Sequence, residues 1–441
     1  MKNRIAPVAF FIVAFAGILV ALWLAPDPAE DKPPATRLDL ADTPKQPSVP
    51  PTWTSELDLV RFTERDGAFW QTTPSGVSVQ ATLDPRLQAF LLQEFRRYEL
   101  PYAAAVVIHL PDGEVRALAG FSAAEPKLTM GELTLKPWAP AASLFKTVSA
   151  LALLVTPSFD PRQPTCYEGG HGGITEKHLV EPPPEKATCE DLETALANSS
   201  NAVLGRLART HLDARRLLDA ASACGFNAEL PFEFAVEKSR FKLSDADPMA
   251  LPQAAAGFGH ATLSPWHAAW LAALIAGDGR VPPVHLLRLA VDREKRPVPL
   301  PLPTARLVSS LPAEAVARLR LMLARTVTLG TAKEGFYKGD EPLVSVTVGG
   351  KTGTLGRTEP QILLYTWFMG YAPVEAPRWA FAVLLVSPEK WRTKASYVSA
   401  RLVNRLIELE EGSGRTPATH APPAFPARPA PAPAPAGQES P

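Results

Sequence analysis

One serine and one lysine of this sequence, Ser143 and Lys146, have the spacing of a nucleophile and its base. Residues three apart lie on the same face of a helix, so the hydroxyl and the amine can touch there. A hydroxyl activated by a neighbouring base is suited to attack on a carbonyl carbon. Two further Ser-x-x-Lys matches begin at Ser239, within a highly charged stretch, and at Ser387, before a proline. Only the first match precedes an apolar run, VSALALLV, that would seat its helix in a core.

Two other short motifs could supply polar groups to the same reaction. Ser199-Ser200-Asn201 is the only Ser-x-Asn sequence in the chain, and it follows a helix-like segment, EDLETALAN. Lys351-Thr352-Gly353-Thr354 is likewise the only sequence of its kind, and it lies in a β-rich run. The first motif is equally compatible with a helix cap and the second with a twisted edge strand. Taken singly, neither motif establishes a function.

The order of the three motifs is more informative than any one of them. Ser-x-x-Lys, then Ser-x-Asn, then Lys-Thr-Gly is typical of penicillin-binding proteins and class A β-lactamases. The chain resembles the penicillin-binding protein family over residues 80–410, including the segments ATLDPRLQ, GFGHATLSPWHAAWLAALIAGDGRVPP, LGTAKEG, SVTVGGKTGT and TWFMGYAP. This resemblance implies a peptidoglycan D,D-transpeptidase domain, a serine acyltransferase that cross-links stem peptides and is acylated by β-lactams.

The resemblance also implies a role for each matching residue. Ser143 would attack the carbonyl between the two D-alanines of a donor stem peptide. Lys146 would remove the hydroxyl proton as a neutral amine, which requires a pKa lowered by burial and by a second cation. Lys351 is the candidate for that cation. Ser199 would relay a proton toward the leaving amine, and Asn201 would hydrogen-bond the peptide backbone.

The Lys-Thr-Gly segment is expected to bind the end of the substrate. Thr352, Gly353 and Thr354 form the predicted substrate-binding segment, in which the two threonines and the lysine before them grip the terminal carboxylate. The backbone N–H groups of Ser143 and Thr354 would form an oxyanion hole, in which one donor typically contributes about 3 kcal/mol. The implied mechanism needs no cofactor and no metal.

The fate of the acyl-enzyme separates the related activities. A class A β-lactamase would hydrolyse it with a glutamate from a Glu-x-x-Leu-Asn segment downstream of Ser-x-Asn, and the sequence lacks that segment. This favours a slowly deacylating transpeptidase that uses an amine acceptor. A D,D-carboxypeptidase, which uses water instead, shares every catalytic residue, and a β-lactam-sensing or scaffold protein of the same fold is a further alternative. We expect no glycosyltransferase domain, because the catalytic region follows closely on the apolar N-terminal segment.

Capping signals and periodicity predict the elements that position these residues. Asp84 and Pro85 begin a helix through RLQAFLLQEFRRY, and AAAVVIHL and EVRALAG flank a turn as a hairpin. TVGGKTGT, QILLYTWFMGYAP and WAFAVLLVSP predict three more strands, followed by a helix at 397–409, while 144–276 is mostly helical. Strands at both ends of the region indicate one sheet built from distant segments. The expected fold is α+β, with a central antiparallel five-stranded sheet flanked by helices and a mainly helical subdomain.

Residues 5–25 carry no charge and are long enough for a transmembrane helix. A cleaved signal peptide is the alternative, but the apolar run exceeds a usual signal core and Pro26 follows the only plausible cleavage position. Lys2 and Arg4 precede the run and acidic residues follow it, which predicts a cytoplasmic N-terminus at residues 1–4. We therefore expect a single-pass protein of the bacterial inner membrane with a periplasmic catalytic domain.

Proline marks the flanks of the predicted catalytic region. Residues 26–53 carry eight prolines, typical of an extended spacer, and 54–79 form a short membrane-proximal segment. The catalytic region at 80–410 is followed by a disordered Ala/Pro-rich tail at 411–441. The helix or the tail could bind other cell-wall synthesis proteins.

Charge and cysteine content exclude other classes of protein. The 45 Lys and Arg residues balance 45 Asp and Glu residues, so nucleic acid is not an expected partner. Cys166 and Cys189 bracket a glycine-rich segment and could pair in an oxidising compartment. Cys224 is left over, as a small buried side chain. The eight histidines show no metal-ligand spacing, so no metal site is expected.

Overall fold

The computed structural model describes residues 38–40, 51–170, 172–243, 247–301, 307–357, 363–388 and 390–412. The transmembrane anchor predicted at 5–25 lies outside the described residues, as do most of the predicted spacer and tail. Among the helices of the described ranges, none has both the length and the apolar character needed to cross a bilayer.

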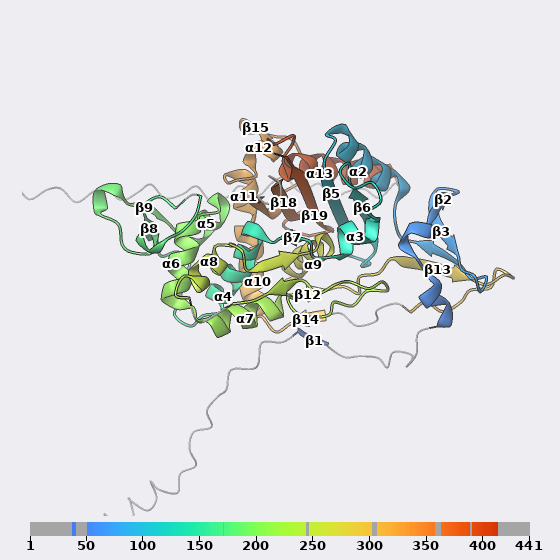
Figure 1. The fold of residues 1–441 in the computed structure, drawn as a ribbon, viewed down its shortest axis with the longest axis horizontal. Coiled ribbons are helices and arrows are strands. Elements are labelled where there is room, and N and C mark those ends of the chain that lie inside the picture. Colours follow the sequence, from blue (N-terminus) through green and yellow to red (C-terminus); the bar gives the residue numbers. More distant parts are fainter. Residues whose placement is uncertain are drawn as a thin grey trace, which may run out of the picture. The chain divides into compact units, whose positions relative to one another are not determined.

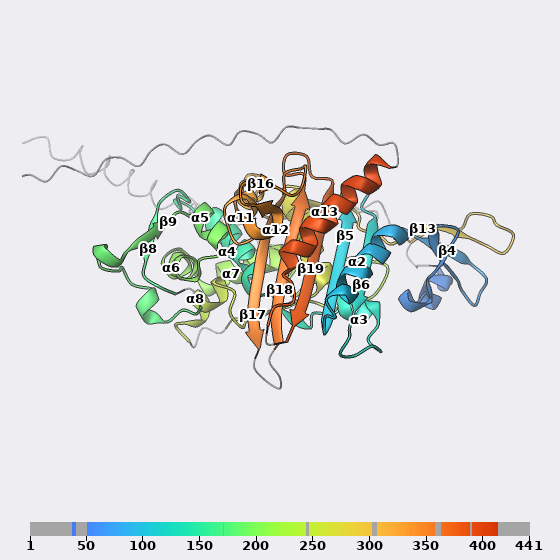
Figure 2. The same ribbon diagram turned by 90° about the horizontal axis from the view of Figure 1, so that it is seen from above.

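A five-stranded antiparallel sheet forms the centre of the fold, as predicted (Figures 1 and 2). Its strands lie in the order β17, β18, β19, β5 and β6, so the two ends of the region build one sheet. The bounds are β17 Gly349–Arg357, β18 Leu363–Ala372, β19 Trp379–Ser387, β5 Tyr102–His109 and β6 Val115–Phe121. β17, which contains the Lys-Thr-Gly motif, is an edge strand of this sheet.

Helices cover both faces of the sheet, which explains the nearly continuous apolar sequences of its inner strands. On β5, Ala103, Ala105 and Val107 face one core, which they share with α2 (Pro85–Arg97) and α13 (Ala395–Glu411). Val106 and Ile108 of the same strand face the other core, which contains α9 (Pro265–Ala276). This alternation is the period of two expected for a strand.

The helix predicted after residue 83 is present and begins as its sequence indicates. The Asp84 carboxylate accepts hydrogen bonds from the backbone N–H groups of Arg86 and Leu87. Pro85 occupies the first turn, where its missing N–H costs nothing. The apolar side of α2, including Leu91 and Leu87, is buried against the sheet.

The region between the two halves of the sheet is a helical lobe, also as predicted. Its helices are α4 Lys146–Leu154, α5 Leu192–Asn198, α6 Asn201–His211, α7 Ala214–Ala223 and α8 Ala250–Ala255. A short hairpin, β8 Thr165–Tyr167 and β9 Thr188–Glu190, lies at its edge. Three helices precede β17 in the chain, namely α10 Ala313–Met322, α11 Ala324–Thr328 and α12 Lys333–Phe336.

A four-stranded antiparallel sheet lies beside the catalytic core and was not predicted. Its strands are β2 Thr63–Arg65, β3 Ala68–Thr72, β4 Ser78–Ala81 and, from far along the chain, β13 Leu287–Val291. The remaining strands are β1 Leu38–Leu40, β7 Ala139–Pro140, β10 Arg240–Phe241, β11 Ala261–Leu263, β12 Arg280–Val281, β14 Leu307–Ser309, β15 Tyr337–Lys338 and β16 Glu341–Pro342. The remaining helix is α3 Met130–Leu135, and short 3-10 turns are η1 Thr52–Glu56, η2 Leu59–Arg61, η3 Ala142–Phe145, η4 Glu176–His178 and η5 Pro184–Lys186.

Candidate active site

A pocket of about 590 Å³ brings the three predicted motifs together. It lies between the helical lobe and the edge strand β17. Its walls include Ser143, Asn198, Ser199, Asn201, Ala256, Gly257, Phe258, Gly330, Thr331, Glu334, Thr352 and Thr354. Residues separated by two hundred positions in the sequence thus share one cavity, which is what a reaction requiring all three motifs needs.

Ser143 lies in the 3-10 turn η3, and α4 begins three residues later at Lys146. The serine was expected to open the helix itself, so the structure moves the start of the α-helix to the lysine. Two contacts hold the segment that contains this turn in place. The indole N–H of Trp367 on β18 donates to the Pro140 carbonyl at 3.0 Å, and Gly257 packs against the peptide that joins Ala142 to Ser143.

Gly257 has to be a glycine for this packing to exist. Its φ is +90°, and a Cβ atom built on it would lie 2.3 Å from the Ala142 carbonyl oxygen. Both the left-handed backbone and the close approach exclude larger side chains. The backbone of Ser143 is therefore held against the end of α8.

The Lys146 side chain is fully buried, and its amine has three oxygen neighbours, each at 2.7 Å. These are the Ser143 hydroxyl, the Asn201 side-chain oxygen and the Ala256 carbonyl. The serine and the first residue of α4 therefore meet as the spacing predicted. A hydroxyl this close to an amine is within reach for direct proton transfer.

Burial and a second cation lower the pKa of this amine. The pKa of Lys146 lies well below its usual value, first because the amine is desolvated and second because the positive charge of Lys351 opposes another charge nearby. Burial also lowers the pKa of Lys351 to about 7. The Lys351 amine donates to the Thr352 carbonyl at 3.2 Å. A neutral Lys146 beside Ser143 can act as a general base.

The Ser199-Ser200-Asn201 motif forms the corner between α5 and α6. Ser199 directly follows α5 and adopts the left-handed conformation, with a φ of 57°. The Ser200 hydroxyl caps α6 by accepting from the Val203 N–H. The helix-cap interpretation is thus correct for Ser200, while Ser199 and Asn201 on either side line the pocket.

The Lys-Thr-Gly motif occupies the middle of β17. Thr352 and Thr354 line the pocket, and the Thr352 hydroxyl hydrogen-bonds the hydroxyl of Thr331. A Cβ at Gly353 would lie 3.2 Å from Trp367 and 3.4 Å from Leu144 in the turn η3. Glycine therefore allows the strand to approach the turn that carries Ser143.

Several pocket groups carry no sequence signal that singles them out. The Ala256 carbonyl contributes through its backbone alone. Gly330 precedes Thr331 and approaches the corner so closely that a Cβ would lie 2.1 Å from the Ala197 carbonyl oxygen. Gly330 lies in the segment LGTAKEG and Ala256 directly precedes the segment that begins GFGH, but no spacing rule assigns either a role.

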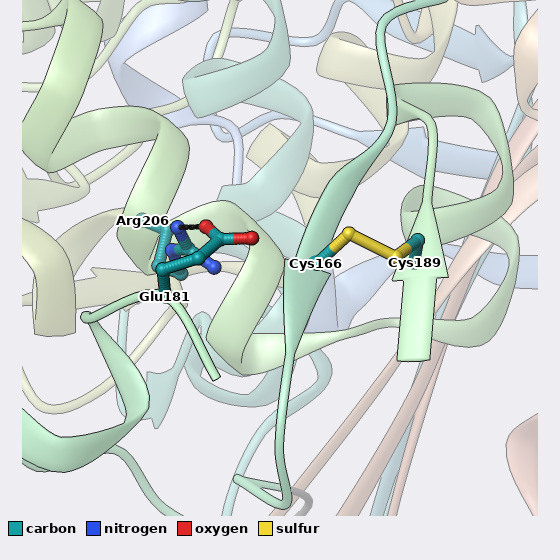
Figure 3. Close-up of a disulfide and its surroundings, with 4 residues drawn as sticks. All are labelled: Cys166, Glu181, Cys189 and Arg206. Carbon is teal, nitrogen blue, oxygen red and sulfur yellow. Dashed lines mark hydrogen bonds and ion pairs between the residues drawn. A yellow bond between two sulfur atoms is a disulfide. The ribbon is translucent and has the colours of Figure 1, made fainter. Parts of the chain in front are cut away.

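Cys166 and Cys189 form a disulfide across the β8–β9 hairpin (Figure 3). Cys224 is a free thiol and fully buried, and desolvation raises its pKa to about 12. Within the described ranges, no three His, Cys, Asp or Glu side chains are grouped so that they could hold a metal ion.

Comparison with known proteins relates this geometry to a family. The sequence profile of the penicillin binding protein transpeptidase domain matches residues 103–408. No curated protein sequence matches significantly. The D,D-transpeptidase domain of a peptidoglycan glycosyltransferase from Eggerthella lenta has a TM-score of 0.62 at 23% identity, covering 83% of this chain and 92% of that one.

Two proteins of Mycobacterium tuberculosis have the same fold. Apo penicillin-binding protein 3 has a TM-score of 0.62 at 17% identity, covering 82% of this chain and 90% of that one. The imipenem acyl-enzyme of penicillin-binding protein A has a TM-score of 0.59 at 18% identity, covering 75% and 79%. The profile match spans most of the chain, and the similar structures share its fold. The chain therefore belongs to the penicillin-binding protein transpeptidase domain family.

Proposed function

We propose that the protein is a D,D-transpeptidase that cross-links peptidoglycan stem peptides through an acyl-enzyme on Ser143. The observation that carries the proposal is the 2.7 Å contact between the Ser143 hydroxyl and the buried Lys146 amine. Family membership supports the serine acyltransferase class. The predicted N-terminal helix at 5–25 would hold the catalytic domain at the outer face of the inner membrane.

The surroundings of Lys146 suit it to accept a proton from Ser143. A neutral amine has two N–H donors and one lone pair. The Asn201 oxygen and the Ala256 carbonyl accept the two donors, so the lone pair faces the Ser143 hydroxyl. The serine oxygen then bonds to the carbonyl carbon of the penultimate D-alanine as its proton passes to the amine.

Collapse of the tetrahedral intermediate breaks the bond to the terminal D-alanine. The leaving nitrogen takes the proton that Lys146 received, and Ser199, which lines the same pocket, would relay it. The backbone N–H groups of Ser143 and Thr354 would stabilise the oxyanion, and Thr352 and Thr354 would bind the terminal carboxylate. The resulting ester on Ser143 then awaits an amine.

The acceptor decides between cross-linking and trimming. An acceptor amine regenerates the serine and joins two stem peptides, whereas water would release a shortened peptide, as in a D,D-carboxypeptidase. β-Lactams would acylate the same serine. Related structures support this, since penicillin-binding protein A carries imipenem as an acyl-enzyme and penicillin-binding protein 3 is complexed with aztreonam.

Product analysis tests the proposal. The full chain is incubated with a stem pentapeptide, with and without a second stem peptide that offers a free amine. We expect a cross-linked dimer and one released D-alanine per bond formed. Lys146→Ala should lower this rate by at least about a hundredfold, the usual contribution of a general base, while Lys242→Ala in another Ser-x-x-Lys match should not. Release of D-alanine without any cross-linked dimer would favour the carboxypeptidase. No reaction of the stem peptide at all would favour the scaffold protein.

A further inference from the structure

The disulfide hairpin lies directly against the corner that carries Ser199. Cys166 and Cys189 are opposite each other in the β8–β9 pairing and are joined by the disulfide. The two residues that follow them in the chain are therefore also held at fixed positions relative to each other. Those two residues are Tyr167 and Glu190, and both are buried. Each contacts one neighbour of Ser199.

The contact on the α6 side involves Tyr167. Its side chain is 6% exposed, and its phenol interacts with both the Ser200 side chain and the Glu190 carboxylate. Burial and the nearby Glu190 carboxylate raise the pKa of the phenol, so it keeps its proton. The Ser200 hydroxyl caps α6, so the phenol interacts with the side chain at which that helix begins.

The contact on the α5 side involves Glu190. Its carboxylate accepts a hydrogen bond from the Asn198 side-chain amide at 2.7 Å, and the residue is 8% exposed. Asn198 is the last residue of α5 and lines the pocket. A buried, charge-assisted hydrogen bond is stronger than a neutral one at the surface, so it holds the end of the helix firmly.

Ser199 needs support from both sides. It is not a glycine, yet its φ is 57°, a left-handed conformation that costs about 1 kcal/mol or more for a residue with a Cβ. A strained backbone conformation of this kind persists only where contacts with the surrounding structure hold it in place. Residues in such conformations are frequent at active sites. Here the neighbours on both sides are held by the hairpin.

The loop that the disulfide closes is anchored to the same part of the site. Ile174 and Leu179 are buried in one small apolar cluster with Ala256, whose carbonyl accepts from Lys146. A Cβ at Gly205 on α6 would lie 2.9 Å from Ile174, so that helix and the loop are in close contact. Figure 3 shows a further link on the surface, the ion pair between Glu181 of the loop and Arg206 of α6.

From this arrangement we propose that Tyr167 and Glu190 are positioning residues for Ser199, and that the Cys166–Cys189 disulfide keeps them in register. The proposal deepens the proposed function and rests on it. It assigns the hairpin a kinetic role in acylation, because a displaced Ser199 delivers its proton to the leaving nitrogen less well. Affinity for the β-lactam should change little, because neither Tyr167 nor Glu190 is among the residues that line the pocket.

Glu190→Leu and Tyr167→Phe test the proposal in the full chain with a chromogenic β-lactam. Each removes one polar contact with little change in volume. We expect the limiting acylation rate to fall about tenfold, the effect of one lost buried hydrogen bond, while the half-saturating β-lactam concentration stays within about twofold. Glu190→Gln keeps the acceptor oxygen for Asn198 and should restore most of the rate.

Two matched substitutions act as controls. Glu185→Leu removes an exposed carboxylate from the same loop, and Tyr102→Phe removes a phenol of the central sheet that hydrogen-bonds Glu125. Both should retain the wild-type limiting rate. Rates are expressed per active site by titration, so a variant that only unfolds loses active sites without losing rate per site. Wild-type rates per site in Glu190→Leu and Tyr167→Phe would overturn the proposal.

The disulfide is tested without refolding, by reducing the folded wild type with a phosphine, since Cys189 is exposed. We expect the limiting rate to fall in the same direction, and reduction to have little further effect on Glu190→Leu. A reduced protein that acylates at the oxidised rate would overturn the role of the disulfide. If the oxidised wild type is not acylated at all, the proposed function fails, which is a different result from an acylated wild type with unaffected variants.

Discussion

The amines of Lys146 and Lys351 are both fully buried, and the positive charge of Lys351 lowers the pKa of Lys146 beyond the effect of burial. Two lysines in one apolar site cannot both hold a proton without a large cost in free energy. The arrangement therefore favours a neutral Lys146 beside Ser143 and one remaining charge on the β17 side.

The pH dependence of β-lactam acylation should report this pair. The rate should rise with pH as Lys146 loses its proton, because only the neutral amine can accept the proton of Ser143. It should fall again as Lys351 loses its charge, near its pKa of about 7. Acylation rates measured across the pH range should pass through a maximum in the wild type. In Lys351→Met, the fall in rate on the alkaline side should be absent. A rate that stays flat well above neutral pH contradicts the account.

Lys351→Met should stabilise the protein while impairing acylation. The unfolded chain holds the Lys351 proton up to the usual pKa of 10.5, whereas the folded chain holds it only up to about 7. Between these values the unfolded state binds more protons, so the free energy of unfolding of the wild type rises with pH. An apolar side chain at this position avoids the cost of burying a charge, so we expect stabilisation of up to about 4 kcal/mol, the upper limit for replaced buried ion pairs.

Thermal unfolding of wild type and Lys351→Met at several pH values checks this. The advantage of the variant should be largest below about pH 7 and should shrink toward pH 10.5 as the wild-type lysine ceases to bind a proton in either state. A variant that is less stable than the wild type at neutral pH would show that the lysine is well solvated or paired when folded.

Gly257→Ala should slow acylation, and Gly259→Ala should not. Both glycines have a positive φ, so each substitution costs about 1 kcal/mol of backbone strain. Only the alanine at 257 would also meet the Ala142 carbonyl, whereas a Cβ at 259 has no atom within 4 Å. Unfolding by denaturant and acylation kinetics on both variants separate the shared strain from the effect on the nucleophile. Equal acylation rates would exclude this steric role of Gly257.

The number of cysteines that react with a thiol reagent should depend on whether the protein is folded and whether it is reduced. In the native oxidised protein we expect no labelling, because two cysteines are paired and Cys224 is buried with a pKa raised to about 12. Unfolding without a reductant should expose one thiol, and unfolding with a reductant three. Mass spectrometry counts the labels. Labelling of the native protein would contradict either the disulfide or the burial of Cys224.

An element of the fold could be predicted where the sequence pattern that specifies it lies within one short segment. β18 and β19 were found because strands covered on both faces read as apolar runs, and α2 because Asp84 and Pro85 are strong start signals. The four-stranded sheet was missed because its short strands pair residues 78–81 with residues 287–291. Nothing in either segment indicates the other.

The same limit applies to the site. Side chains with distinctive chemistry, such as Ser143 and Lys146, can be predicted from type and spacing. The Ala256 carbonyl and the close packing of Gly257 cannot, because a backbone atom contributes without any requirement on the side-chain type around it. The pairing of Cys166 with Cys189 also stayed open, since spacing in sequence does not fix the distance between two Cα atoms.

Peptide mass spectrometry after incubation of the full chain with benzylpenicillin tests the central claim most directly. The account predicts one covalent penicilloyl adduct per molecule, on the peptide that contains Ser143. The adduct should be absent from Ser143→Ala and unchanged in Ser387→Ala, the serine of another Ser-x-x-Lys match. An adduct on a different residue, or one that persists in Ser143→Ala, would contradict the assignment of the nucleophile.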